Sequence, residues 1–334
     1  MRARAHLPER CGIVVIGRNE GARLGRALDA AVATGKPVVY VDSRSTDDSV
    51  LLAKECGADV VELDATVHLS AAVARNAGAD RLLAEHPSIE FVQFIDGDCI
   101  LEPDWVDRAV AVLVADPTLA AVCGRRRESN PQRNVFHRIA EIEWGLGGTG
   151  AVDAFGGDVM IRVEWFRRAG GYNPVVMAGE DPELSARIRG EGGTIVRLDA
   201  VSTWHDIRMI SVRQWWRRAE RSGYGGALVA HLHRRSDRLY VPETQRALLW
   251  GAAAPLGALV LIRWTRLPLL AVVAKYCLSA FRAGRGARGA RLTSLDRIAW
   301  GVSCVMSAVP QAIGAVRYLR EAFLGRHPHL IEYK

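Results

Sequence analysis

Apolar residues in about the first 115 positions alternate between short runs and helical spacing. Short runs rich in β-branched residues predict strands over 12–16, 37–42, 59–63 and 91–95. Between them, apolar side chains recur every three or four residues, which predicts helices over 20–34, from 45 onwards and over 70–85. Strands that alternate with helices imply an α/β fold with a mixed, mostly parallel sheet flanked by helices.

Acidic residues directly follow two of these predicted strands. Asp42 ends the strand 37–42, and Asp96 and Asp98 follow the strand 91–95. Ligands of parallel sheets bind beyond the carboxyl ends of the strands. We therefore expect the three carboxylates to line one site.

The segment 117–205 is less regular, and glycine pairs at 156–157, 170–171 and 192–193 predict frequent loops. A short helix is expected over 184–190. Glu180-Asp181-Pro182 introduces it, because acids and proline are favourable in a first helical turn. We assign residues 1–235 to the α/β domain and residues 236–334 to a C-terminal region of apolar and amphipathic helices.

Composition changes at about residue 245. Nearly apolar stretches cover 248–262, 267–281 and 298–316, interrupted by Arg263, Arg266 and a loop with arginines at 282, 285, 288 and 291. The stretches are shorter than, or broken within, the about 20 residues that a membrane span needs. The arginine and tryptophan residues that flank these stretches are typical of a membrane–water interface. We expect a hairpin or interfacial helices on an anionic membrane surface, with a buried helical subdomain as the alternative.

The bulk composition narrows the class of protein only a little. The 334 residues are 49% hydrophobic and 24% charged, which suits a folded chain with a sizeable core. The net charge of +7 suits an anionic partner, namely a nucleotide diphosphate, an anionic lipid surface or a nucleic acid, and cannot choose among them. The six cysteines lack C-x-x-C spacing, which fits a reducing compartment. The basic, polar residues 1–10 predict no secretory signal.

Asp96-Gly97-Asp98 is the first candidate for chemistry. Two carboxylates at a strand end are hard oxygen ligands that suit Mg²⁺ or Mn²⁺ shared with a diphosphate. A solvated acidic turn is the alternative. Asp42 can accept a hydrogen bond from a nucleotide base, while Ser45 or Asp47 caps the following helix.

Other residues supply the remaining parts of a site. Arg75 on a helix can reach a nucleotide phosphate with paired donors. Of the adjacent acids Glu180 and Asp181, one can act as a general base and the other can serve the helix N-terminus. His205 is a candidate metal ligand or diphosphate contact, or a structural histidine.

Gln214, Trp215 and Arg217 open a helix just before the change of composition. The aromatic side chain suits stacking on a sugar, and the arginine suits a phosphate. An aromatic and basic helix resting on lipid headgroups is equally consistent with the pattern.

Together, these residues resemble the inverting family 2 glycosyltransferases of the GT-A fold, of the type that acts on bacterial polysaccharides and glycolipids. The resemblance covers roughly residues 12–226, and its pieces occur in the family's order. Residues 13–20 look like the opening strand and turn, with Arg18 and Glu20 on the donor side. The segment 41–47 is similar to Val-Asp-Asp-Gly-Ser-Thr-Asp, with Ser43 and Arg44 as departures.

The later motifs complete the resemblance. Ala74-Arg75-Asn76 matches a donor-facing segment, and Asp96-Gly97-Asp98 matches the metal-binding D-x-D. Gly157 and the glycines before Tyr172 look like acceptor-side segments. Glu180-Asp181 matches the pair whose aspartate is read as the base. Residues 214–218 look like a variant of Q-x-x-R-W with Arg218 in place of tryptophan, which argues against processive synthesis.

The resemblance implies an inverting transfer from a nucleoside-diphosphate sugar to a hydroxyl of a saccharide or lipid-linked acceptor. Asp181 would activate that hydroxyl, and a metal on Asp98, with Asp96 near the ribose or the metal, would stabilise the leaving nucleotide. The reaction would take place at the cytoplasmic face of the membrane, and no nucleic acid partner is expected.

Three alternative classes of protein are weighed against this one. A sugar-phosphate nucleotidyltransferase shares the sheet but needs a glycine-rich phosphate loop after the first strand, which 17–21 does not supply. A dehydrogenase of the Rossmann type needs G-x-G-x-x-G there, which is also missing. A non-catalytic, membrane-associated nucleotide-sugar-binding protein accounts for 245–334, but not for acids at three strand or loop ends.

Overall fold

The computed structural model describes residues 10–64, 69–287 and 292–326. Its internal contacts divide the chain into two compact units. Unit 1 holds the described residues up to Arg127 together with 148–174 and 180–206, and unit 2 holds 128–147, 175–179 and the described residues from 207 onwards. The helix over 212–232 therefore groups with the C-terminal helices, and a functional boundary at 235/236 stays a prediction.

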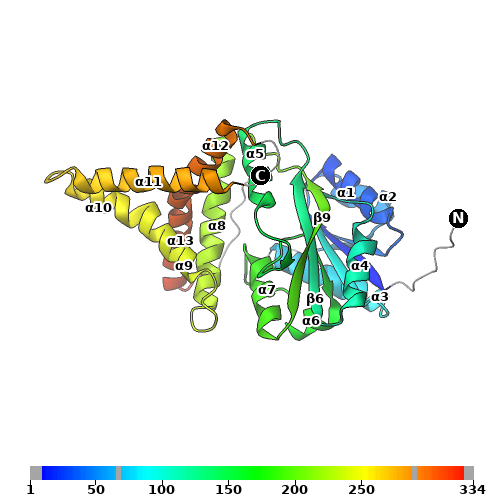
Figure 1. Cartoon of the computed structure of the whole chain (residues 1–334). Coiled ribbons are helices and arrows are strands. Elements are labelled where there is room, and N and C mark those ends of the chain that lie inside the picture. The colour runs from blue at the N-terminus through cyan, green and yellow to red at the C-terminus, as the bar shows by residue number, and fades with distance from the viewer. Residues whose placement is uncertain (1–9, 65–68, 288–291, 327–334) are drawn as a thin grey trace. The chain divides into compact units, whose positions relative to one another are not determined.

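Unit 1 is built, in the part of the chain that the structure describes, on a nine-stranded sheet (Figure 1). Its order is β3-β2-β1-β4-β8-β6-β9-β5, with β7 paired to β9. The pairs among β1, β2, β3 and β4 are parallel, as the alternating pattern predicted, and β8, β5 and β7 join antiparallel. The sheet is therefore mixed. The strands are β1 Cys11–Gly17, β2 Val38–Asp42, β3 Asp59–Glu62, β4 Phe91–Asp96, β5 Cys99–Leu101, β6 Leu119–Glu128, β7 Gly150–Ala151, β8 Val159–Arg162 and β9 Thr194–His205.

Helices cover both faces of this sheet because its strands alternate their apolar side chains. Ile13 and Val15 of β1 pack in one cluster with Leu24 and Trp105, whereas Val14 packs in the other with α3, α6 and α7. The helices of unit 1 are α1 Ala22–Val32, α2 Ser49–Glu55, α3 Ala71–Glu85, α4 Trp105–Ala115, α6 Val163–Arg168 and α7 Glu180–Gly190. The predicted short helix over 184–190 is confirmed as the later part of α7.

The strand register brings the predicted acids to one edge of the sheet. Gly17 at the end of β1 pairs with Asp42 of β2, and Ile16 pairs with Asp96 of β4. The carboxyl ends of the three strands are thus level. The turn after β4 is fixed there, because the Gly97 amide donates to the Ile16 carbonyl at 2.7 Å.

Unit 2 is helical. Glycines bring its helices into backbone contact: a Cβ at Gly223 of α8 would collide with the backbone of Gln311 on α13, and one at Gly301 of α12 with that of Ala280 on α11. Small residues at such crossings are typical of helices that pack within membranes. Its elements are α5 Val135–Gly145, α8 Val212–Leu232, α9 Val241–Leu248, the π-helix η1 Leu249–Ala253, α10 Ala254–Leu261, α11 Leu267–Gly286, α12 Ser294–Met306 and α13 Ala308–Phe323.

The apolar stretches of unit 2 are largely exposed. Trp264 and Leu267 are 73% and 72% exposed. Among the described residues, two helical stretches are long and apolar enough to cross a membrane by length and composition: α11, Leu267–Gly286, and Ser294–Phe323, in which α12 runs into α13. Only 11% and 28% of their apolar windows are buried. Helices buried in a soluble core would have little apolar surface left to expose. The two helices support membrane association without choosing between spanning and interfacial placement.

These lengths correct the expectation that each apolar run is too short to span. The helices continue beyond the runs, because polar residues form their ends. Thr293 and Asp296 make a capping box that starts α12 ahead of the apolar run. α10 ends at Leu261 and α11 begins at Leu267, so Arg263 and Arg266 lie between the two helices, as predicted. The expected loop is wrong for Arg282 and Arg285, which lie on α11, whereas positions 288 and 291 lie outside the described residues.

The exposed apolar surface generates a prediction for fractionation. Full-length protein should sediment with membranes and stay there after high-salt and alkaline carbonate washes, because salt screens lipid–arginine attraction but leaves apolar burial intact. Immunoblots of each fraction would measure this. Release by salt alone would indicate attachment through charge only, and recovery in the supernatant without detergent would contradict membrane association.

Candidate active site

A buried arginine lies at the centre of the candidate site. Arg75 of α3 is 2% exposed. Its Nη2 donates to Asp96 at 2.9 Å, and its Nη1 donates to Glu180 at 2.8 Å and lies 3.4 Å from Asp181. The structure thus brings the end of β4 and the start of α7 together around one guanidinium. The expectation that Arg75 contacts a nucleotide phosphate stays a prediction, since these acids occupy both terminal nitrogens.

A second arginine holds the other side of Asp96. Nη2 of Arg126 on β6 lies 3.2 Å from Oδ2 of Asp96, the oxygen that does not bind Arg75. Nε of Arg126 donates to Asp158 at 2.6 Å. Asp158 also accepts from the Thr203 hydroxyl. Burial raises the pKa of Asp96, but Arg75 and Arg126 outweigh it, so the pKa is lowered and the carboxylate stays charged.

Gly157 is required by this cluster. A Cβ there would lie 2.7 Å from Nη2 of Arg75 and 2.8 Å from Oδ2 of Asp96. Any larger residue would therefore push the ion pair apart. The acceptor-side role expected of Gly157 stays a prediction.

Asp181 differs from Asp96 in its protonation. Burial is the largest influence and raises its pKa, Arg75 lowers it, and the charges of Glu180 and Asp96 raise it again, to about 7. A carboxylate with a pKa near neutrality suits a general base, because it is partly ionised and still binds a proton well. Glu180 shares Arg75 at the start of α7.

Tyr172 and Asn76 fix the position of Asp181. The Tyr172 hydroxyl lies 3.3 Å from Asp181, and its ring packs edge-on against Phe94. Asn76 binds both backbone groups of Tyr172, at 2.7 and 2.9 Å. Gly171, at φ +69, makes room for the amide oxygen of Asn76. The Ala-Arg-Asn and Gly-Gly-Tyr motifs are therefore two halves of one contact.

Asp98 and His205 form a separate pair next to this cluster. Nε2 of His205 lies 3.2 Å from one oxygen of Asp98, and Nη1 of Arg23 lies 3.3 Å from the other. Glu20 is buried and paired with Arg23. Sequence reasoning missed Arg23, Arg126 and Asp158; Asp158 directly follows the glycine pair 156–157, a signal that could have found it.

The Asp98–His205 pair fits a divalent ion. Neighbouring ligands of an octahedral ion at about 2.1 Å lie about 3.0 Å apart, close to the observed 3.2 Å. Together with Cys99, their ligand atoms fall within 4.8 Å of one another. Burial raises the pKa of the Cys99 thiol well above its usual value, so the thiol stays protonated and ligates poorly. Asp96 groups with Cys99 and Asp158 instead, so its direct part in metal binding stays a prediction.

The loops after β1 and β2 are joined by hydrogen bonds at the carboxyl ends of these strands. The side-chain oxygen of Asn19 accepts a hydrogen bond from the Thr46 backbone amide at 2.7 Å. The backbone amide of Asn19 donates to the Ser45 hydroxyl at 2.9 Å. Asp42 accepts from Tyr40 at 2.9 Å and from the Ser45 amide at 2.7 Å. A carboxylate has about four acceptor positions, so these two hydrogen bonds leave room for a nucleotide base. Base recognition by Asp42 stays a prediction.

Ser43 and Arg44, the two departures from the family motif, lie in the loop after β2. Arg44 stands where the resemblance has glycine, and its φ of +62 explains why glycine is favoured there. Arg18 is half-buried in the loop after β1. Its place on the donor side, like that of Glu20, stays a prediction.

The three residues expected to open a helix belong to unit 2. Gln214 accepts from the Ile210 amide at 2.9 Å at the start of α8, and Arg217 is exposed. Trp215 donates to Ser303 at 3.0 Å and lines a cavity of that unit. Their expected acceptor or diphosphate role stays a prediction.

Comparisons with known proteins bear on the family and the fold. The family model "Glycosyl transferase family 2" matches residues 12–169. An uncharacterised glycosyltransferase of Rickettsia felis is 40% identical over 53 residues, 16% of this chain, and the match spans about a fifth (19%) of that relative's length.

Two solved structures share the fold. A mannosyltransferase from Pyrobaculum calidifontis, solved with GDP-Man and Mn²⁺, is 20% identical, with a TM-score of 0.62 over 93% of this chain and 87% of its own. TarS residues 1–349 of S. aureus are 14% identical, with a TM-score of 0.53 over 90% of this chain and 91% of their own. The expected GT-A-like fold is confirmed, and residues 12–169 match the model of glycosyl transferase family 2.

Proposed function

We propose that the protein is an inverting glycosyltransferase that depends on Mg²⁺ or Mn²⁺. It moves a sugar from a nucleoside-diphosphate donor to a hydroxyl of a lipid-linked or cell-envelope saccharide, at the cytoplasmic face of the membrane. One observation carries the proposal: the buried Arg75 joins Asp96 of the D-x-D to Glu180 and Asp181 in a single cluster.

The proposed chemistry follows from the different pKa values of the carboxylates. Asp181, with a pKa near 7, accepts the proton of the acceptor hydroxyl. The hydroxyl oxygen bonds to the anomeric carbon as the bond to the diphosphate oxygen breaks, and the electron pair leaves with the diphosphate. Attack from the face opposite the leaving group inverts the configuration. Tyr172 and Arg75 hold Asp181 in place during this step.

Asp98 and His205 are proposed to serve the diphosphate leaving group. Asp98 and His205 would hold the divalent ion, which supplies positive charge next to the departing diphosphate. The donor class is supported by the shared fold with a mannosyltransferase solved with GDP-Man and Mn²⁺. The membrane location is supported by the two long apolar helices.

A non-catalytic nucleotide-sugar-binding protein is the second candidate. It would need the donor loops and the metal pair, but it gives no reason for a buried acid with a pKa near neutrality. Turnover of labelled nucleotide sugars separates the two.

Replacing Asp98 should abolish metal-dependent turnover. We expect Asp98→Ala to lower release of nucleoside diphosphate in the presence of Mn²⁺ by more than about 100-fold, since losing even an outer partner of a metal ligand costs about 10–100-fold. Asp104→Ala is the matched control, because Asp104 is an exposed acid whose side chain caps nothing. A donor screen with and without Mn²⁺ gives the rates. Undiminished turnover in Asp98→Ala at saturating Mn²⁺ would refute the metal assignment.

Replacing Asp181 should separate binding from transfer. Asp181→Asn keeps the shape and cannot take a proton, so transfer should fall by about 10²–10⁴-fold while donor affinity stays within a few-fold. Calorimetric titration with the donor measures affinity, and product formation measures transfer. If donor affinity fell as far as the rate, Asp181 would be a donor ligand and not the base.

A further inference from the structure

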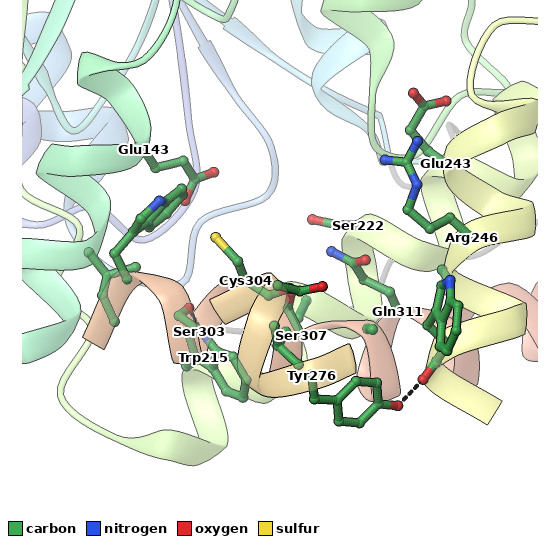
Figure 2. A pocket seen from close by; sticks show the side chains of 18 of the residues that line it. Glu143, Trp215, Ser222, Glu243, Arg246, Tyr276, Ser303, Cys304, Ser307 and Gln311 are labelled. Atoms are coloured by element: carbon green, nitrogen blue, oxygen red, sulfur yellow. Dashed lines mark hydrogen bonds between the residues drawn. The ribbon is translucent and has the colours of Figure 1, made fainter. Parts of the chain in front are cut away.

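A cavity of about 450 Å³ lies within unit 2, among helices that the proposed chemistry does not use (Figure 2). Its walls come from α5, α8, α9, η1, α11, α12 and α13. Figure 2 shows Arg246 and Tyr276 on one side and Glu143 and Trp215 on the other. Such a volume is typical of small-ligand pockets, which measure about 300–1,000 Å³.

The charges in this cavity are unbalanced. Arg218 is neutralised by Glu143 through two hydrogen bonds of 2.8 and 2.9 Å. Among the described residues, Arg246 makes no ion pair, and Lys275 contacts only the Ser279 hydroxyl at 2.6 Å and the Trp250 ring at 4.7 Å. Arg246, Lys275 and Glu243 are all exposed residues of the cavity wall, so two cations face one carboxylate. The cavity therefore favours an anion.

Lys275 carries this charge within an apolar helix. It lies in the middle of α11, one of the two helices long and apolar enough to cross a membrane. A cation in a lipid environment is costly unless it meets an anion or water, so such a residue usually marks a binding site. The apolar neighbours Leu270 and Val273 on the same helix are exposed, which places membrane-compatible surface beside the cavity.

The wall around Lys275 is structurally unusual. Trp250 lies in η1, and π-helical turns often occur at functional sites. The turn leaves the Trp250 carbonyl to accept a hydrogen bond from the Tyr276 hydroxyl, which ties η1 to α11. Trp215 and Trp300 add aromatic surface from α8 and α12. Aromatic rings beside cations suit a ligand with a charged head and an apolar chain.

We propose that this cavity binds the anionic phosphate head of a membrane lipid. Arg246 and Lys275 contact the phosphate, and the tryptophans pack against the first carbons of the chain. Trp215 is the one lining residue for which a role in glycosyl transfer was also expected, and the phosphate contacts rest on Arg246 and Lys275. The proposal therefore stands whether or not Asp181 is the base.

The test uses full-length protein in an uncharged detergent. Short-chain phosphatidic acid, phosphatidylcholine with the same chains and inorganic phosphate are each titrated while tryptophan fluorescence is recorded, because three tryptophans line the cavity. We expect saturable binding of phosphatidic acid, about tenfold or more weaker in Arg246→Gln/Lys275→Gln, since two charge-assisted hydrogen bonds are lost. The matched control is Arg263→Gln/Arg282→Gln, which removes the same charge from exposed positions outside the cavity.

The outcomes are distinct. Weakening in the cavity variant with unchanged binding in the control supports the proposal, provided that both variants melt at the wild-type temperature. Equal weakening in both variants would reduce the effect to general surface charge and overturn it. So would equal affinity for phosphatidylcholine or the absence of saturable binding. Inorganic phosphate bound as tightly as the lipid would overturn the lipid assignment in favour of a free-anion site.

Discussion

A guanidinium removed from water needs carboxylates around it, and the site is organised by that requirement. Arg75 is nearly inaccessible, and Asp96, Glu180 and Asp181 surround it. Removing one partner of a buried pair typically costs about 3–5 kcal/mol, because the remaining charge is left unpaired. Loss of Arg75 would leave three acids in mutual repulsion. The arginine thus holds two segments of chain about 100 residues apart in one arrangement.

This arrangement gives neighbouring carboxylates different chemical properties. Asp96 lies between two arginines and stays ionised, whereas Asp181 has one arginine, two acidic neighbours and a pKa near 7. Similar side chains can therefore divide the work of holding the donor and accepting a proton. Side-chain contacts join the scaffold around them: Tyr172 packs on Phe94, and Asn76 donates a hydrogen bond to the Tyr172 backbone.

Much of the fold could be predicted from sequence, since the strands from 11 to 96 follow local alternation and the motifs occur in family order. The partners of Arg75 could not be predicted. Helical spacing places the arginine on α3, but it does not show how α3 packs against β1. Arg23 illustrates the same limit: a helix arginine is usually solvated, yet this one is buried between Glu20 and Asp98. The helix lengths in unit 2 were underestimated because apolar content was counted and the capping box at Thr293 was not.

The central claim is that Asp181, held by Arg75, is the base of a glycosyl transfer reaction. The pH dependence of kcat/KM for the acceptor tests it most directly, since this parameter reports the ionisation of the free enzyme. A protonated Asp181 cannot accept a proton, so the account predicts that log kcat/KM rises with unit slope below a pH of about 7 and levels off above it. It also predicts that this limb is missing from the residual activity of Asp181→Asn. A flat profile through neutrality, or the same limb in Asp181→Asn, would contradict the account.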